Sequence, residues 1–529
     1  MKRLVIVGVV LLFLVAAGAG TWAITSSSDD DDQSGTLGPA ATGSASETGS
    51  GVPDAREAPS PELQEFYDQQ LDWGTCEDDD YTDRECARIE VPLDYDDPTG
   101  ATIELQLLKN EADEPAQRIG SLVVNPGGPG APGTSYADYD DAFGQPLRDR
   151  FDIIGFDPRG TGSSSPVDCL SDRELDGYIA ADPDPDTPDE VREFMGWADK
   201  LGQGCETKSG QVADHVSTHE AARDIDILRA VLDEKKLTYF GASYGTKLGA
   251  TYADLFPERS GRLVLDGAVD VSLSLKDSSL QQAEGFEVAL GAYVDDCVDS
   301  GGCYLGDSRP EALRTIKDFL AGVEDEPIPV GDRELAVGNA FYGIIIPLYN
   351  RDYWQALTDR LGAAMDGKAA GLLELSDLYS SRNEDGTYDD NSAEAIYAIN
   401  CLDDPAYITA PRVPSQYADF EKASPTFGRV FAWGLTGCSG FDAEGTRADW
   451  DLDAAGADPL LVIGTTRDPA TPLRWAKALA AQLDPAILVT RDGDGHTGYN
   501  MDNSCVDDVV ESYLIDGDVP DADVDCPAP

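Results

Sequence analysis

The stretch Leu237-Thr-Tyr-Phe-Gly-Ala-Ser243-Tyr-Gly-Thr246 decides the fold. It opens with a short apolar run, Leu237 to Phe240, of the kind that forms a buried strand, and an apolar helical pattern runs from Tyr244 to Phe256. Between them, Gly241 to Gly245 fits G-x-S-x-G, in which a serine stands on a strained turn from strand to helix. A chance pentapeptide in a glycine-rich turn is the alternative, but chance rarely supplies both flanking elements. We therefore predict that Ser243 is a nucleophile.

Other short apolar runs, separated by turn residues, lie on both sides of this stretch, and such runs are typical of strands buried in a parallel sheet. A helical pattern from His219 to Glu234 precedes the serine, with Ser217 and Glu220 as its capping box. The alternation of strand and helix indicates an α/β fold with a mostly parallel central sheet. The other predicted strands are Ser121 to Val124, Phe151 to Phe156, Leu263 to Leu265, Leu460 to Ile463 and Ile487 to Val489.

The 529 residues exceed what one core usually holds, so more than one structural unit is expected. Helical patterns replace the strand rhythm over residues 271–449, which we interpret as an inserted, mainly helical cap domain. The sheet core then comprises residues 61–270 and 450–529. The Ser-, Gly- and Asp-rich residues 25–60 indicate a flexible linker. Local patterns predict a helix over Glu62 to Leu71, a hairpin from Ile89 to Leu93 and Ile103 to Leu108, and cap helices over Leu313 to Val323 and Tyr353 to Met365.

The first 24 residues are typical of an export signal. Met1-Lys-Arg3 precedes an apolar run from Leu4 to Gly20, and the small residues Ala17 to Ala19 suit cleavage. The run can be extended to Ile24, so an uncleaved membrane anchor stays open as the alternative. Either interpretation places the protein outside the cytoplasm, secreted or tethered to the outer face of the membrane, with no other contact to the membrane expected.

The ten cysteines form an even set in a chain expected to be exported, which favours disulfides over free thiols. They contain no C-x-x-C pair of the kind that zinc sites use. Spacing alone does not fix the connectivity. Pairing of neighbours in sequence would give Cys76–Cys86, Cys169–Cys205, Cys297–Cys303, Cys401–Cys438 and Cys505–Cys526.

The chain carries 38 basic and 100 acidic side chains, a formal charge of −62. This charge repels phosphates, so nucleic acid is excluded as a partner. Two interpretations of the acidic surface stay open: it steers cationic substrates, or it maintains solubility.

A serine hydroxyl needs a general base, and imidazole is the usual one. Of only three histidines, His215 and His219 precede Ser243, whereas His496 follows it. The order Ser, acid, His that accompanies this type of elbow therefore favours His496. His215 and His219 have the spacing of a metal-binding pair, but Val216 stands where a zinc protease helix carries glutamate, so we expect a helix start there. The predicted chemistry requires no metal and no cofactor.

The acid that orients the imidazole should follow a strand beyond the cap. Asp468 comes after the predicted strand that ends at Ile463, and the chain order favours it. Asp266, after the predicted strand that ends at Leu265, is the rival.

An oxyanion hole needs two backbone N–H groups. We assign one to Tyr244, directly after the nucleophile, and the other to Gly128 in Asn125-Pro-Gly-Gly-Pro-Gly130, whose two prolines have no N–H. A plain tight turn is the alternative for this glycine loop.

Taken together, these motifs resemble the secreted tripeptidyl aminopeptidase branch of the proline iminopeptidase-like α/β-hydrolases. The resemblance covers nearly all of the chain after residue 60, and the family's nucleophile, acid and base correspond to Ser243, Asp468 and His496. One departure is Ala131-Pro132, where relatives often carry small residues such as Gly-Ser. The motifs are Leu71 to Cys76, Val91 to Tyr95, Asn125 to Gly130, Phe156 to Gly162, Gly241 to Thr246, Ala398 to Cys401, Asp468 to Pro472, and Gly495 with His496.

The resemblance implies the α/β-hydrolase fold and an exopeptidase that binds peptide substrates by a free N-terminus beneath the cap. A protonated amine needs a carboxylate partner, for which Asp403, Glu284 and Glu287 are the candidates. An esterase or lipase of the same fold is the alternative enzyme. A non-catalytic binding module is the alternative outside enzymes, because a fold does not guarantee function.

Overall fold

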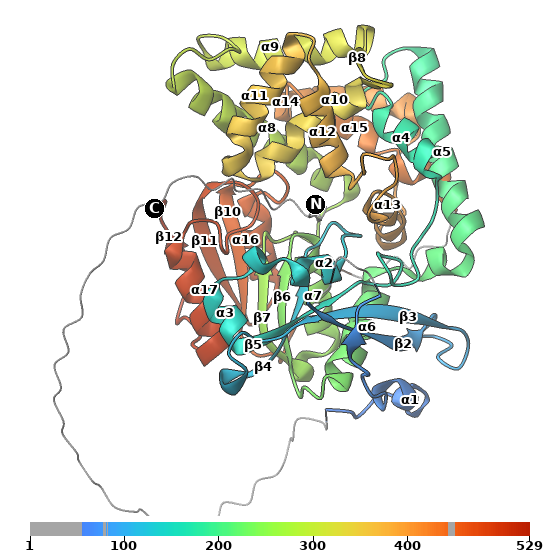
Figure 1. Cartoon of the computed structure of the whole chain (residues 1–529), viewed down its shortest axis with the longest axis vertical. Coiled ribbons are helices and arrows are strands. Elements are labelled where there is room, and N and C mark those ends of the chain that lie inside the picture. The colour runs from blue at the N-terminus through green and yellow to red at the C-terminus, as the bar shows by residue number, and fades with distance from the viewer. Residues whose placement is uncertain (1–54, 78–80, 82, 443–449) are drawn as a thin grey trace, which may run out of the picture.

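The computed structural model describes residues 55–77, 81, 83–442 and 450–529. The predicted export signal and most of the predicted linker, up to residue 54, lie outside the described residues. Within the described ranges, no helix combines the length and the apolar character needed to cross a membrane. The chain forms a large sheet with a layer of helices along one end of it (Figure 1).

In the part of the chain that the structure describes, the central sheet has ten strands, and most of their pairings are parallel. The pairings of β1 with β2, β2 with β3 and β3 with β5 are antiparallel. The predicted α/β class with a mostly parallel sheet is therefore confirmed. In spatial order the strands are β1 (Gly74–Thr75), β2 (Glu85–Pro92), β3 (Thr102–Asn110), β5 (Phe151–Phe156), β4 (Gly120–Asn125), β6 (Leu237–Ala242), β7 (Ser260–Asp266), β10 (Leu460–Arg467), β11 (Ala486–Asp494) and β12 (Val524–Cys526).

Helices cover both faces of this sheet, which is why its central strands are buried along nearly their whole length. Alternate residues of a strand point to opposite faces. Leu122 and Val124 of β4 join one apolar cluster, and Val123 joins the other. The first cluster includes α2 (Gly133–Asp138), α3 (Gln145–Arg150) and α17 (Ser504–Asp516), and the second includes α6 (Thr218–Val231), α7 (Tyr244–Leu255) and α16 (Leu473–Gln482).

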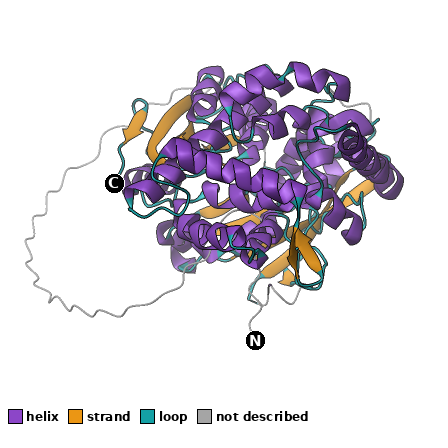
Figure 2. Cartoon of the chain, turned by 90° about the horizontal axis from the view of Figure 1, so that it is seen from above, coloured by secondary structure: helices purple, strands orange, loops and turns teal. Residues whose placement is uncertain are grey.

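A second layer of helices is inserted between β7 and β10 and has an apolar cluster of its own. Figure 2, which views the molecule from above, shows helices over most of the face, with strands visible mainly at the edges. The elements of the insertion are α8 (Leu275–Asp299), α9 (Arg309–Asp325), β8 (Ile328–Val330), β9 (Arg333–Leu335), α10 (Val337–Ile345), α11 (Trp354–Met365), α12 (Ala370–Tyr379), α13 (Ser392–Asp403), α14 (Tyr417–Ala423) and α15 (Gly428–Gly434).

Two helices from the first half of the chain also pack against this layer. They are α4 (Asp172–Ala180) and α5 (Pro188–Ser209), which the expected boundary at residue 270 assigned to the sheet core. A Cβ on Gly338 of α10 would lie 2.3 Å from the carbonyl oxygen of Ile179, and a Cβ on Gly202 would lie 2.0 Å from that of Gly440. Such close approach shows that the helical layer is built from two separate stretches of sequence.

Local patterns fixed many elements but not their ends. The capping box of α6 forms between Ser217 and Glu220 as expected. The helix expected over Glu62 to Leu71 is shorter, a single turn at Pro61–Leu63 followed by α1 (Gln64–Tyr67). All ten cysteines form disulfides, each with the cysteine nearest to it along the chain, as pairing of neighbouring cysteines would give.

Candidate active site

Ser243 lies on the sharp turn between β6 and α7. Its backbone has φ 55° and ψ −124°, a strained conformation for a residue with a side chain. A hydrogen bond to the sheet keeps the backbone in this conformation: the Ser243 N–H donates to the carbonyl oxygen of Asp266, the last residue of β7, at 2.8 Å. A Cβ on Gly241 would lie 2.3 Å from the carbonyl oxygen of Gly245, so the turn closes only with glycine there. This is the geometry that G-x-S-x-G predicts for a nucleophile elbow.

Asp468 and His496 lie in contact at the ends of two adjacent parallel strands, β10 and β11. Nδ1 of His496 lies 2.9 Å and 3.0 Å from the two carboxylate oxygens of Asp468. Asp468 is 2% exposed and also accepts the N–H groups of Ala470 and Thr471 at 2.9 Å and 2.8 Å. A carboxylate beside Nδ1 fixes the tautomer with the proton there, which leaves Nε2 free to accept a proton.

Two opposing effects set the pKa of His496. Burial of the imidazole lowers it, because a low dielectric disfavours the charged form. The charge of Asp468 and its hydrogen bond raise the pKa by more, so the net pKa lies above the ordinary value. The ring is therefore a stronger base than a histidine in water, as a group that removes a serine proton should be.

His496 and Ser243 both approach the same short stretch, Asp266-Gly267. The Asp266 carbonyl receives the Ser243 N–H, and a Cβ on Gly267 would lie 3.1 Å from Cε1 of His496. Gly267 has φ +67°, a conformation that glycine adopts without strain. The absence of a side chain at this position lets the imidazole come close to the backbone that holds the elbow.

The carboxylate of Asp266, the rival acid, bonds to backbone N–H groups and not to the imidazole. It accepts the backbone N–H groups of Gly498 and Tyr499, each at 2.8 Å. Burial raises the pKa of Asp266 to about 6, although these two hydrogen bonds pull the pKa down. Asp266 thus fastens the loop that follows His496, whereas the imidazole itself bonds to Asp468.

The glycine loop Asn125 to Gly130 is pressed against the elbow. A Cβ on Gly127 would lie 2.5 Å from the carbonyl oxygen of Ala242 and 2.9 Å from both Cβ of Ser243 and the nitrogen of Tyr244. The Gly127 N–H donates to the Asn125 side chain at 3.0 Å, so it is not available to a substrate. Gly128, with φ +103°, is the next donor along the loop, and Tyr244 begins α7, where N–H groups have no partner within the helix.

Each of the three carboxylates suggested for amine binding has a partner within the chain. Asp403 is 2% exposed and is ion-paired with Lys247 at 2.7 Å. Glu287 accepts hydrogen bonds from Ser424 and Thr426, inside the helical layer. Glu284 pairs with Arg474 at 2.6 Å, with both side chains close to half exposed. Asp403 and Glu287 are therefore committed to contacts within the fold.

The two other histidines have separate surroundings. His215 bonds through Nδ1 to Glu220 at 2.9 Å and belongs with Asp94 and Glu220 to a group whose ligand atoms lie within 4.8 Å of one another. The ring of His219 packs on Trp450 with centroids 4.9 Å apart. His215 precedes α6 and His219 lies in its first turn, so a helix starts there as predicted.

Sequence reasoning missed two residues that contact the base. The Thr471 hydroxyl lies 3.0 Å from the Asp468 carboxylate and 3.3 Å from Nδ1 of His496. Its position three residues after Asp468 was a usable signal, because hydroxyls often bond to a nearby turn. Tyr349 accepts the His496 N–H at 2.7 Å on its carbonyl oxygen. It comes from the insertion, and no local pattern pointed to it.

Comparisons with known proteins identify several hydrolases that are similar to this chain. The family model described as TAP-like protein, of the α/β-hydrolase type, matches residues 424–526. The chain is 35% identical to the serine protease Hip1 of Mycobacterium tuberculosis, over 83% of this chain and 87% of that protein. It is 33% identical to carboxylesterase B of the same species, over 86% and 90%.

A tripeptidyl aminopeptidase of Streptomyces lividans is 28% identical to this chain, over 86% of each. Among solved structures, a proline iminopeptidase of Mycobacterium smegmatis is 16% identical, with a TM-score of 0.34 and coverage of 81% of this chain and 97% of that one. The sheet order, the elbow and the identity to Hip1 over most of both chains lead to one conclusion. The chain belongs to the tripeptidyl aminopeptidase-like family of α/β-hydrolases.

Proposed function

We propose that this hydrolase is a serine exopeptidase that removes short peptides, tripeptides in particular, from free N-termini through an acyl-enzyme. The contact between His496 and Asp468 beside the strained Ser243 carries the proposal. The names of two relatives, serine protease Hip1 and tripeptidyl aminopeptidase, support a peptide bond as the target.

In the proposed mechanism, Nε2 of His496 takes the proton of the Ser243 hydroxyl as the oxygen attacks the peptide carbonyl. The negative charge that forms on the carbonyl oxygen is stabilised by the N–H groups of Tyr244 and Gly128. His496 then gives its proton to the leaving amine. A water molecule, deprotonated in turn by His496, releases the short N-terminal product and restores the serine. Asp468 stays ionised and holds the imidazole in place.

Of the three candidate carboxylates, Glu284 is the one that we propose for the substrate amine. Its segment of α8 packs against the turn that carries the proposed acid: a Cβ on Gly285 would lie 2.5 Å from the carbonyl oxygen of Pro469. The pair of Glu284 with Arg474 is exposed. Exposed ion pairs stabilise a fold by less than about 1 kcal/mol, so a bound ammonium group displaces the arginine at little cost.

The proposed place of action is outside the cytoplasm. The five disulfides support this, because such bonds persist in oxidising compartments.

An esterase is the second candidate, since the same residues cleave acyl esters and one relative is named carboxylesterase B. The test compares tripeptidyl-arylamides with free and blocked N-termini and a short acyl ester as substrates. We expect the free peptide to be cleaved with a higher kcat/KM than either the blocked peptide or the ester, and a preference for the ester would favour the second candidate. Glu284→Gln should raise KM for the free peptide and leave that for the ester unchanged.

Ser243→Ala tests the nucleophile itself. The variant should lose activity by about 10⁴-fold or more and should not react with a fluorophosphonate probe. Ser165→Ala is the matched control, because Ser165 is another serine with positive φ, 49°, and lies outside the elbow. Full activity of folded Ser243→Ala would refute the assignment and, with it, the acyl-enzyme.

A further inference from the structure

Asp403 ends helix α13 in the insertion and is buried between that helix and two helices of the sheet core. Its carboxylate accepts the N–H and the hydroxyl of Thr218 at 2.9 Å and 2.5 Å, and it pairs with Lys247 at 2.7 Å. Thr218 begins α6, and Lys247 lies in α7. A buried carboxylate is costly unless every oxygen is satisfied, and here both oxygens are.

This cluster reaches the residue that follows the nucleophile. The Tyr244 hydroxyl lies 2.6 Å from the Thr218 hydroxyl. Thr218 has a single hydroxyl proton, and the charged Asp403 receives it, so Tyr244 is the donor to Thr218. Burial raises the pKa of the Tyr244 phenol well above its ordinary value, which keeps that proton on Tyr244. The hydrogen bonds therefore run in one direction, from Tyr244 through Thr218 to Asp403.

The other end of α13 touches the glycine loop. A Cβ on Gly130 would lie 2.8 Å from Cβ of Ala395 and 3.0 Å from the nitrogen of Ile396. One helix of the insertion thus contacts the loop that carries Gly128, at Gly130, and is linked to Tyr244 through Thr218.

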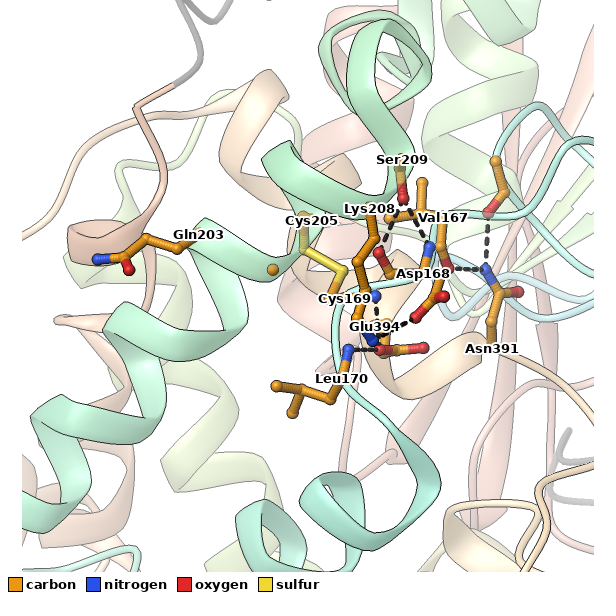
Figure 3. Close-up of a disulfide and its surroundings, with 12 residues drawn as sticks. Val167, Asp168, Cys169, Leu170, Gln203, Cys205, Lys208, Ser209, Asn391 and Glu394 are labelled. Carbon is orange, nitrogen blue, oxygen red and sulfur yellow. Dashed lines mark hydrogen bonds and ion pairs between the residues drawn. A yellow bond between two sulfur atoms is a disulfide. The ribbon is translucent and has the colours of Figure 1, made fainter.

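The N-terminal half of α13 is anchored independently of Asp403. The amide of Asn391 bonds to the backbone of Gly160, Gly162 and Val167. The Glu394 carboxylate accepts the N–H groups of Cys169 and Leu170 (Figure 3) at 2.8 Å and 2.5 Å. Because these contacts hold the helix in place, removal of the Asp403 charge alone leaves α13 docked.

We propose that Asp403 is a positioning residue that orients the Tyr244 N–H in the oxyanion hole, so that the inserted helices support the chemical step directly. The inference rests on the proposed function, in which that N–H stabilises the developing charge. Lys247, in the first turn of α7 with Tyr244, pairs with the same carboxylate, and its ammonium group also lies 4.0 Å from the centre of the Trp450 ring.

The test compares Asp403→Asn with Asp377→Asn. Asp377 is a matched control, since it pairs with Arg333 inside the insertion at 2.6 Å. We expect Asp403→Asn to lower kcat about 10- to 100-fold, with KM changed less than twofold, because a small misplacement of a donor affects mainly the transition state. The rate of fluorophosphonate labelling of Ser243 should fall in parallel. The control, Asp377→Asn, should keep the wild-type kcat, KM and labelling rate.

A second set of variants keeps the test decisive if Asp403→Asn does not fold. Thr218→Val removes the hydroxyl that joins Tyr244 to Asp403 and should reproduce the loss of kcat. Thr218→Ser keeps a hydroxyl and should have the wild-type kcat. The effects of Thr218→Val and Tyr244→Phe should not add in the double variant if both act through one chain of hydrogen bonds.

Three outcomes would overturn the inference. They are wild-type kcat in folded Asp403→Asn, a rise in the KM of Asp403→Asn without a change in kcat, or additive effects of Thr218→Val and Tyr244→Phe. Failure of the proposed function looks different, because active Ser243→Ala would show it whatever Asp403 does. An inactive Ser243→Ala together with wild-type kcat in folded Asp403→Asn would reject only the positioning role.

Discussion

The backbone N–H of His496 donates to the carbonyl oxygen of Tyr349 at 2.7 Å, and the two rings meet edge to face with centroids 5.4 Å apart. Tyr349 belongs to the insertion. Asp468, which bonds to Nδ1 of the same imidazole, follows a strand of the sheet. The proposed base is therefore held by both layers of the molecule. A change in how the layers pack alters its orientation.

The pH dependence of activity should report the environment of His496. Burial lowers the pKa of this imidazole and Asp468 raises it by more, so the net pKa is above normal. The base acts only when neutral, so kcat/KM should fall as the pH drops through that raised pKa. Asp468→Asn removes the charge that raises the pKa, so the acid limb should move to lower pH while kcat falls by about 10⁴-fold.

Profiles of kcat/KM between about pH 5 and 9 check this prediction. His215→Gln is the control: Glu220 raises the pKa of His215 too, but this ring should leave the acid limb unchanged. An acid limb at the wild-type position in Asp468→Asn would contradict the role of Asp468.

Asp266→Ala should destabilise the fold. The substitution leaves the buried N–H groups of Gly498 and Tyr499 without an acceptor, which costs about 1–3 kcal/mol for each. Urea unfolding at pH 5 is the appropriate measurement, since below the Asp266 pKa of about 6 the carboxyl is mostly neutral and relief of a buried charge contributes little. Removal of the exposed Asp299 by the same substitution should not change the midpoint. A midpoint equal to wild type in Asp266→Ala would mean that the loop needs no such anchor.

Gly127→Ala should abolish most activity with a smaller effect on folding. The new Cβ would lie 2.5 Å from the carbonyl oxygen of Ala242, and φ is +100°, so the glycine loop must move away from the elbow. Displacement of a donor by about 1 Å lowers the rate about 10²-fold. Gly196→Ala, in α5 with nothing within 4 Å of the new Cβ, should keep full activity and add about 1 kcal/mol of stability. Normal kcat in Gly127→Ala would remove the loop from the proposed mechanism.

Thermal stability should fall as the pH rises, in part because of Asp184. Burial raises the pKa of this carboxyl to about 7, with nearby Asp182 and Glu324 adding to the shift, although Arg429 opposes it. The folded state binds the proton more tightly than the unfolded chain, whose aspartate pKa is about 4. The stabilisation is complete below about pH 4 and is lost as the pH rises to about 7.

Asp184→Asn cannot ionise, so its Tm should decline less than that of the wild type between about pH 5 and 8. Calorimetry on both proteins measures the difference. The exposed Asp366, replaced in the same way, should give the wild-type slope. Equal slopes for Asp184→Asn and the wild type would show that Asp184 ionises without penalty.

Local chemistry made much of this molecule predictable. β5 has the predicted bounds, Phe151–Phe156, because a buried strand between turns is a short-range signal. The turn at Ser243 was also predictable, since its glycines are required by contacts a few residues away.

Contacts between distant segments were not predictable in this way. No local pattern around Asp403 indicated that its carboxylate would form an ion pair with Lys247, far earlier in the chain. Helix α5 packs against the insertion at Gly202, and its amphipathic pattern alone does not show which segment covers its apolar face. Substrate contacts depend on such pairings, so the sequence could not show that the carboxylates of Asp403 and Glu287 have partners within the fold.

The insertion also determines when the enzyme can first act. Strands β7 and β10 are neighbours in the sheet, yet the whole insertion separates them along the chain. Bringing them together closes a very long loop, and pairings of that kind form late in folding. A polypeptide synthesised from its N-terminus thus carries an inert serine until the segments with Asp468 and His496 have been made and docked. The proposed hydrolytic activity can therefore appear only after the C-terminal segments have folded onto the rest of the sheet.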